Sequence, residues 1–191
     1  FLIDNLYPLT VFFYFCQSLA NPDPALVKAA EVLAKRTKEI MEKNPKMSII
    51  AMGDFNTIDD NDPHPFKTVL YKDNLFQDVT SKQKVPGTYY FAPKDQWNSL
   101  DHFFVNKVLT DSKDLEVSIK SFEIYSPTFI TEEIKKKMHS REELSMKLVI
   151  APKRFNPEAT KKDTIGYSDH FPIMVKLEYP DGVKKKGFNR K

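Results

Sequence analysis

The chain has 191 residues, of which 41% are hydrophobic and 29% are charged, and its formal net charge is +3. This length and composition are those of one ordinary globular domain, with two small domains as the alternative, and they exclude a fibrous or wholly disordered protein. The small positive charge permits a polyanionic partner without implying one. The single cysteine, Cys16, excludes a disulfide within the chain, so the cysteine content indicates no compartment.

The first segment, FLIDNLYPLTVFFYFCQS, is apolar and aromatic but is interrupted by Asp4, Asn5 and Pro8. Its uninterrupted part is shorter than the roughly 20 residues of a membrane-spanning helix, and no basic segment precedes it as in a signal peptide. A buried strand over Leu9 to Phe15 is therefore predicted. The chain starts with Phe1 rather than methionine, which indicates that sequence upstream has been removed or is not shown.

An amphipathic helix is predicted to begin at Asp23 and Pro24, because a capping residue followed by proline is typical of a helix start. It should end at Asn44-Pro45, and a strand from Met47 to Met52 should follow. Strand, helix and strand at this spacing indicate a βαβ-like unit, or a helix that covers one face of a sheet. The expected apolar face of the helix consists of Leu26, Ala29, Ala30, Leu33, Thr37, Ile40 and Met41.

The second half of the chain is expected to contain mainly short strands. A short helix is predicted over residues 63–71. The charged segment 126–149 is expected to be helical in part and to form a surface excursion between two strands. Residues 1–180 should form the domain, and residues 181–191 a solvated basic tail. The predicted strands cover residues 88–91, 100–105, 115–124 and 173–177.

Polar side chains lie at the ends of two of the predicted strands, 47–52 and 100–105. In IIAMGDFNTIDD, a buried-looking strand runs directly into Asp54 and Asn56. In SLDHFFV, Asp101 begins an apolar strand, and because side chains alternate along a strand, His102 should share a face with Phe104. Taken alone, GDFN is better explained as a polar turn after a strand, and SLDHFFV as a strand whose first residues still belong to the loop.

A third motif, GYSDHFPIMVKLE, places Asp169 and His170 directly before another apolar strand. Single histidines are usually structural or exposed, and this is the expectation for His64, His102 and His139. An Asp-His pair at a strand edge is a stronger signal of chemistry, because a carboxylate holds the imidazole in one tautomer.

Phosphoester hydrolysis requires the side chains that these three motifs supply. A divalent cation held by carboxylates stabilises charge on the phosphoryl and leaving oxygens. An in-line attack also needs a positioned, deprotonated water and a proton donor near the phosphate. The apolar strands next to each motif would bring the strand ends to one rim of the sheet.

The motifs GDFN, SLDHFFV and GYSDHFPI, in this order and at these separations, resemble the later motifs of the endonuclease/exonuclease/phosphatase superfamily. The segment GTYYFAPKDQWNSLDHFFV adds to the resemblance, which runs from about Pro8 to Leu177. The resemblance implies an α/β (α+β) fold: a four-layer αββα sandwich of two mainly antiparallel sheets flanked by helices. Such a domain would be N-terminally incomplete here, with only its C-terminal two-thirds present.

The resemblance also implies catalytic and metal-binding roles. Asp54 would polarise the attacking water and bind metal, and Asn56 would orient the water or contact the phosphate. Asp101 would hydrogen-bond His170, which would stabilise phosphoryl charge or act as acid and base. Asp169 would contribute to metal binding, directly or through water. The implied cofactor is Mg²⁺, with Mn²⁺ or Ca²⁺ as alternatives.

The implied substrate-binding residues are Asn56, Tyr14 and Trp97. Members of the superfamily carry an Asn-His pair at the end of the strand before the first long helix, and these positions fall on Tyr14 and Phe15. Members also carry an earlier metal-ligand Glu, which would lie upstream of this chain. The alternatives are a truncated active enzyme, a domain that has lost its activity, and an unreliable sequence over the first eighteen residues.

The function that the sequence favours is divalent-metal-dependent hydrolysis of phosphodiester bonds, with nucleic acid as the partner. A phosphatase or a sphingomyelinase-like lipid phosphodiesterase is the alternative within the same chemistry. A catalytically inactive binding module is a further alternative, and so is an unrelated α/β protein with polar strand ends. The sequence names no compartment, and export stays open because many bacterial members of the superfamily are exported.

Overall fold

The computed structural model describes residues 9–15, 23–58, 60–80, 84–111, 115–139, 144–161 and 164–179. The predictions for residues 1–8 and for the basic tail lie outside the described residues. The chain divides into two units, and each is described by itself. The first unit contains residues 1–81, 101–122 and 175–191, and the second contains residues 82–100 and 123–174.

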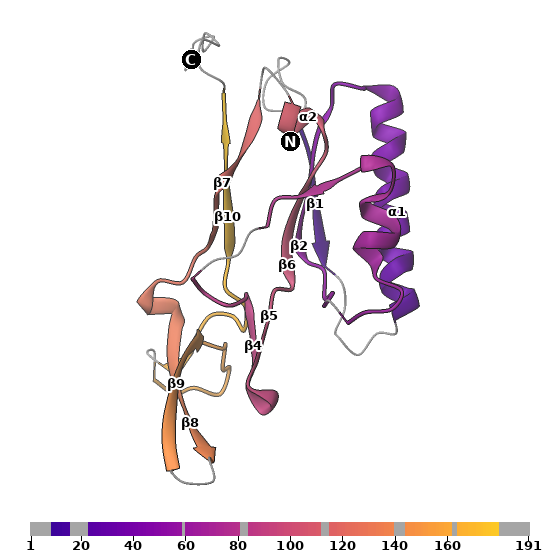
Figure 1. The fold of residues 1–191 in the computed structure, drawn as a ribbon. Coiled ribbons are helices and arrows are strands. Elements are labelled where there is room, and N and C mark those ends of the chain that lie inside the picture. Colours follow the sequence, from indigo (N-terminus) through magenta and orange to yellow (C-terminus); the bar gives the residue numbers. More distant parts are fainter. Residues whose placement is uncertain are drawn as a thin grey trace, which may run out of the picture. The chain divides into compact units, whose positions relative to one another are not determined.

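A βαβ crossover builds the sheet of the first unit. Strands β1 (Leu9–Phe15) and β2 (Ser48–Asp54) pair in parallel, and helix α1 (Asp23–Lys43) connects them. Parallel neighbours require such a crossover connection. Strand β6 (Asp101–Val105) pairs antiparallel with β2, and the short β3 (Gln77–Asp78) pairs with β6. The strand order is therefore β1-β2-β6-β3, which confirms the predicted βαβ-like unit; Figure 1 labels β1, β2 and β6 of this sheet.

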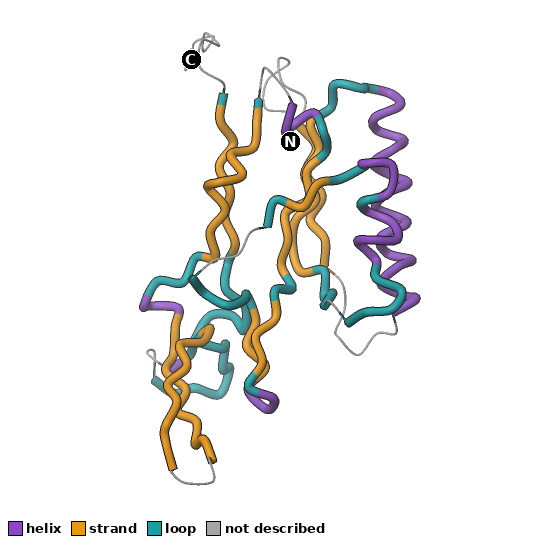
Figure 2. Tube along the Cα trace, viewed as in Figure 1, coloured by secondary structure: helices purple, strands orange, loops and turns teal. Residues whose placement is uncertain are grey.

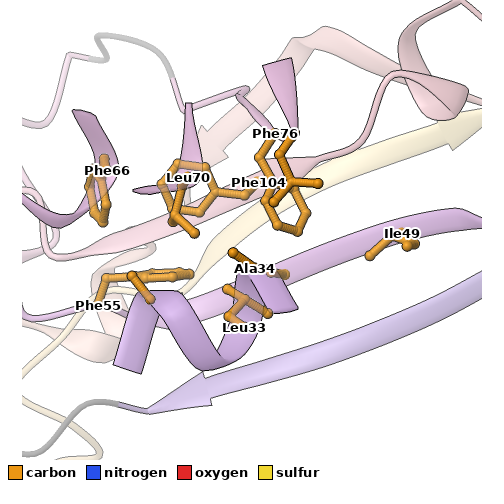
Figure 3. Packing of buried hydrophobic residues seen from close by; sticks show 11 residues of the cluster. Leu33, Ala34, Ile49, Phe55, Phe66, Leu70, Phe76 and Phe104 are labelled. Atoms are coloured by element: carbon orange, nitrogen blue, oxygen red, sulfur yellow. The ribbon is translucent and has the colours of Figure 1, made fainter. Parts of the chain in front are cut away.

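Helix α1 packs its predicted face against this sheet. Leu26, Leu33 and Thr37 are buried, and α1 ends at Lys43, before Asn44-Pro45 as expected. Figure 3 shows Leu33 and Ala34 facing the buried side chains of the sheet and of the segment that follows β2. The buried residues of this core are Ala30, Leu33, Ala34, Ile49, Ala51, Phe55, Phe66, Leu70, Leu75, Phe76 and Phe104.

The remaining helical elements of the first unit are short. The predicted helix over 63–71 is a π-helical turn, η1 (Phe66–Leu70), and a 3-10 turn, η2 (Lys72–Asn74), follows it. Helix α2 (Val108–Asp111) comes after β6. Strands β7 (Glu116–Ile124) and β10 (Ile173–Glu178) form a two-stranded sheet that contains residues of both units. Both strands confirm their predictions.

The second unit contains a hairpin of two short strands. Strand β4 (Tyr89–Phe91) confirms a predicted strand and pairs antiparallel with β5 (Gln96–Asn98), a strand that was not predicted. The 3-10 turn η3 (Ala92–Lys94) connects them, and Asp95 after it has a φ of 53°, in the left-handed region that aspartate tolerates. The small core of this unit contains Tyr90, Val149 and Ala151, with Ala92, Trp97 and Ile134 packed against them.

The expectation of helix within residues 126–149 is wrong. Apart from the 3-10 turn η4 (Thr128–Ile130), the segment forms an antiparallel hairpin of β8 (Thr131–His139) and β9 (Leu144–Pro152), drawn as strands in Figure 2. Val149 and Ala151 are buried, whereas Leu148 and Ile150 are exposed, so the pattern has the period of two residues that a strand requires. The many charged side chains had suggested a solvated helix.

The elements together form a mixed α/β chain with several antiparallel pairs of strands and few helices. The α/β fold class that the resemblance implied is confirmed. No helix within the described ranges has both the length and the apolar character needed to cross a membrane.

Candidate active site

Three strand ends meet at one edge of the sheet in the first unit. Asp54 is the last residue of β2 and Asp101 is the first residue of β6, and the two are register partners. Directly opposed residues of an antiparallel pair place their side chains on the same face, with Cβ atoms about 4.5–5.5 Å apart. Phe15, the last residue of β1, is the partner of Asp54 on the other side. Two carboxylate residues therefore lie side by side at this edge, next to the end of β1.

The turn after β2 holds the carboxylate of Asp54 in place. Asn56 donates its backbone N–H to Oδ1 of Asp54 over 2.9 Å and its side-chain Nδ2 to Oδ2 over 3.0 Å. Asn56 is buried, with 6% of its surface exposed, and has a φ of 46°, which asparagine tolerates better than most residues. Gly53 has a φ of 133°, a conformation that favours glycine. Gly53 and Asn56 thus adopt the backbone angles that the turn requires, and Asn56 also holds the carboxylate of Asp54.

Phe55 anchors the same turn in the core. Its ring centroid lies 4.8 Å from that of Phe104 and 5.6 Å from that of Phe66, both nearly perpendicular to it. Edge-to-face aromatic pairs of this kind add to the stabilisation that burial provides. The side chain between Asp54 and Asn56 therefore fixes the position of both polar residues.

His102 has a structural role, as expected. Its Nδ1 lies 2.8 Å from Oδ2 of Asp78, and its ring is stacked on Phe104 at 5.5 Å, which confirms that the two side chains share a face of β6. His64 is structural as well, because its Nδ1 accepts the backbone N–H of Phe66 over 3.2 Å. Asp78 was not predicted from the sequence, because it comes from a different strand, β3.

The third motif lies in the second unit, next to β4. His170 forms an isolated β-bridge with Tyr89, and their ring centroids are 5.0 Å apart. The backbone N–H of His170 donates to Oγ of Ser168 over 3.1 Å, and Asp169 is exposed. Phe171 is buried beside Trp97, with stacked rings 6.1 Å apart. The Asp-His pair is thus held on the Gly-Thr-Tyr strand that contributed to the resemblance.

Thr88 joins two segments within the second unit. Its buried hydroxyl accepts the backbone N–H of Leu100 over 3.1 Å, and its carbonyl accepts the backbone N–H of Phe171 over 2.8 Å. Leu100 directly precedes Asp101 in the chain, and Phe171 directly follows His170. The pairing of the Asp101 carboxylate with the imidazole of His170 stays a prediction, because the two residues belong to different units.

The two expected substrate contacts outside the acidic turn also stay predictions. Trp97 is partly buried and packs against Tyr90, with ring centroids 5.1 Å apart. The backbone of Tyr14 lies in β1 opposite Gly53, one residue before the strand end. Trp97 therefore contributes to the core of the second unit whatever its role toward substrate.

Tyr90 and Asp95 form a hydrogen bond whose effect can be measured. The Tyr90 hydroxyl donates to Oδ1 of Asp95 over 2.6 Å, while Lys147 pairs with Oδ2 at 3.0 Å. Burial, together with this hydrogen bond and the charge of Asp95, raises the pKa of Tyr90 from 10.0 to about 12. The hydrogen bond from Tyr90, followed by the one from Lys147, lowers the pKa of Asp95.

We expect the alkaline stability of the protein to depend on Tyr90. Above pH 10 the unfolded chain ionises Tyr90, whereas the folded chain keeps the proton until about pH 12. The free energy of unfolding should therefore fall as the pH rises through this window, by about 2–3 kcal/mol at most. Urea unfolding between pH 9 and pH 12 measures this loss. The Tyr90→Phe variant should lose less stability over the same window, and an equal loss in both proteins would contradict the prediction.

The donor atoms at the strand ends suit a hard divalent cation. Mg²⁺ is usually bound by one or two carboxylates together with water and substrate phosphate, and Asp54 and Asp101 supply carboxylate oxygens at one sheet edge. Within the part of the chain that the structure describes, no three His, Cys, Asp or Glu side chains cluster as a complete metal site. The carboxylate oxygens at this edge are the type of ligand that Mg²⁺ prefers.

The chain is therefore a mixed α/β protein with carboxylate residues at the ends of neighbouring strands, where their oxygens can serve as hard ligands. The sequence model of the Endonuclease/Exonuclease/phosphatase family matches residues 17–179. The chain belongs to this family, which confirms the resemblance of the three motifs. Membership supports hydrolysis of phosphate esters as the type of chemistry, and members of the family commonly use divalent metals.

A similar solved structure is an endonuclease/exonuclease/phosphatase family protein from Bacteroides thetaiotaomicron. It is 18% identical in sequence, with a TM-score of 0.48, and the match covers 88% of this chain and 47% of that protein. The chain thus spans about half the length of the solved protein. No curated protein matches the chain.

Proposed function

We propose that the protein hydrolyses phosphodiester bonds with the help of a divalent metal ion, and that its substrate is nucleic acid. The observation that carries this proposal is the pairing of Asp54 with Asp101 at one sheet edge, with both oxygens of Asp54 held by Asn56. A carboxylate that is fixed in this way at a strand end supplies a hard oxygen ligand for a divalent cation. Family membership favours phosphate-ester chemistry for that cation.

Asp54 and Asp169 are the proposed ligands of the metal, with Mg²⁺ as the first choice and Mn²⁺ or Ca²⁺ as alternatives. When bound, such an ion would stabilise the charge on the phosphoryl oxygens. Asp54 would also accept the proton of the attacking water. Asn56 would orient that water or contact the phosphate, since its amide is already fixed beside Asp54.

His170 is proposed to donate a proton or a hydrogen bond to the phosphoryl group, with Asp101 holding its imidazole in one tautomer. Within the second unit, Thr88 holds the backbone next to His170, because its carbonyl oxygen accepts the N–H of Phe171. The bridge between His170 and Tyr89 restricts the position of the imidazole further.

Nucleic acid is favoured over a small headgroup because the chain carries a net positive charge of +3. A protein that neutralises several backbone phosphates loses affinity steeply as the salt concentration rises. A phosphatase or a lipid phosphodiesterase that binds one headgroup should show little dependence on salt. Affinity measured between 50 and 200 mM salt (about a fourfold range) therefore separates these substrates.

A second candidate function is a binding module without catalysis. Phe15 favours it, because Phe15 stands at the end of β1 as the register partner of Asp54. By resemblance, this is the position at which the family carries a histidine, and a phenyl ring cannot transfer a proton.

The test is metal-stimulated hydrolysis by the purified full-length protein. We expect cleavage of plasmid DNA and of bis-p-nitrophenyl phosphate with Mg²⁺ or Mn²⁺, and loss of cleavage with EDTA or in the His170→Ala variant. Phospholipid headgroups serve as the third substrate class. If none of the three substrates is cleaved with either metal, the catalytic proposal is wrong and the binding module is favoured.

A further inference from the structure

Arg154 is a basic side chain that lies close to the Asp-His motif within the second unit. Its Nη2 donates to the carbonyl oxygen of Tyr90 over 3.3 Å, and its Cζ lies 5.5 Å from the centroid of the Tyr89 ring. A guanidinium has five N–H donors, so this hydrogen bond uses a small part of its capacity. Among the residues that the structure describes, no carboxylate forms an ion pair with Arg154.

The loop that leads into the Asp-His motif fixes the backbone of Arg154. Tyr167 donates its N–H to the carbonyl oxygen of Lys153 over 2.8 Å. Gly166 has a φ of 71°, and a Cβ atom there would lie 1.9 Å from the carbonyl oxygen of Arg154. Only glycine permits this approach. Arg154 and the start of the Asp-His motif are therefore placed by the same backbone contacts.

The ring of Tyr89 contacts both Arg154 and His170. The imidazole ring of His170 lies 5.0 Å from the Tyr89 ring, and the guanidinium of Arg154 lies 5.5 Å from it. A cation held over an aromatic ring has a restricted orientation, and Arg154 is exposed and therefore accessible to a ligand. The planar guanidinium is well suited to bind two oxygens of one phosphate. The guanidinium of Arg154, which has no carboxylate partner among the described residues, thus contacts the same aromatic ring as His170.

We infer that Arg154 binds a second phosphate of the substrate, next to the phosphate at which His170 acts. The inference rests on the proposed function and narrows the substrate to compounds with phosphates at successive positions, such as a nucleic-acid strand. A substrate with a single phosphate, bound at His170, would leave Arg154 without a phosphate to bind. Arg154 is then a specificity-determining residue, because it contributes to the binding of only one class of substrate.

The Arg154→Gln variant tests the inference through two substrates. Glutamine can still donate to the carbonyl oxygen of Tyr90, but it lacks the charge. We expect KM for an oligodeoxynucleotide to rise about ten- to a hundredfold, the size of a lost charge-assisted hydrogen bond. KM for bis-p-nitrophenyl phosphate, which has one phosphate, should change by less than about twofold. An equal effect on both substrates, or no effect on either, would overturn the inference.

Arg36→Gln is the matched control. Arg36 lies on the exposed face of α1 in the other unit and pairs with Glu39 at 3.0 Å, so this variant removes the same charge elsewhere. We expect its KM values to match those of the unaltered protein. Circular dichroism and thermal unfolding of both variants show whether each one is folded.

A binding measurement separates the inference from the catalytic proposal. With EDTA present, calorimetry should show that the protein binds thymidine 3′,5′-bisphosphate more tightly than thymidine 5′-monophosphate, and that Arg154→Gln abolishes this preference. A protein that shows this preference but cleaves nothing would contradict the catalytic proposal and support the inference. A protein that cleaves DNA but shows no preference would overturn the inference alone.

Discussion

Replacement of Asp54 by asparagine should lower kcat for phosphodiester hydrolysis by about 10²- to 10⁴-fold, the range that a positioned general base contributes. The carboxylate of Asp54 is oriented by two hydrogen bonds from Asn56 and lies beside Asp101. Asparagine keeps the size of the side chain and one oxygen acceptor but cannot take a proton from water. Steady-state hydrolysis of bis-p-nitrophenyl phosphate with Mg²⁺ or Mn²⁺ measures the change.

Asp111→Asn provides the matched control for this variant. Asp111 is an exposed residue in α2 that pairs with Lys107 at 3.3 Å, within the same unit as Asp54. Its replacement removes an equal charge, and we expect kcat to stay within about twofold of the unaltered value because surface charges far from a reaction have small effects. A similar loss in both variants, or no loss in Asp54→Asn, would contradict the role of Asp54.

The beginning of the fold could be predicted because local and long-range requirements agree there. The apolar positions of α1 recur with the period of a helix, Asp23 and Pro24 mark its start, and Asn44-Pro45 marks its end. The flanking strands are continuous apolar runs, as expected for a parallel pair that is covered by a helix. Helix, strands and crossover then follow from one another.

The hairpin of β8 and β9 was not predicted because its sequence satisfies two patterns. Its charged residues suit an exposed helix, and only the burial of Val149 and Ala151 reveals the period of a strand. Lys136 lies over the ring of Tyr90, with Nζ 5.3 Å from the centroid. From the sequence alone, a lysine that packs its aliphatic stem and its charge against an aromatic ring is indistinguishable from a solvent-facing lysine.

The candidate site was predictable where its residues stand at strand ends. Asp54 and Asp101 each adjoin an apolar run, and antiparallel pairing of those runs brings them together. Arg154 and Asp78 gave no such signal, because their importance depends on contacts with Tyr89 and His102 that are distant in sequence. Candidate residues at strand ends can be recognised in the sequence from the apolar run beside them. The residues that support them can be recognised only from contacts in the folded protein.

The Phe15→His variant should raise kcat for metal-stimulated hydrolysis by about ten- to a hundredfold. Phe15 ends β1 opposite Asp54, so its backbone lies at the edge where Asp54 and Asp101 meet. An imidazole at this position would add a proton donor or acceptor within the same row of residues. General acid–base groups contribute 10²- to 10⁴-fold when well placed, and a newly introduced group should reach at most about the low end of that range.

Phe13→His is the control for this gain. Phe13 lies two residues earlier in β1, pairs with Met52, and is 80% exposed, so histidine is tolerated there but lies away from the strand ends. We expect no gain in kcat for Phe13→His, measured with bis-p-nitrophenyl phosphate and with plasmid DNA. Equal rates in Phe15→His and the unaltered protein would contradict the proposed geometry of the edge. The unaltered protein could instead be inactive while Phe15→His is active. That result would show that the loss of one imidazole turned an enzyme into a binding module, since the carboxylates beside this position are already in place.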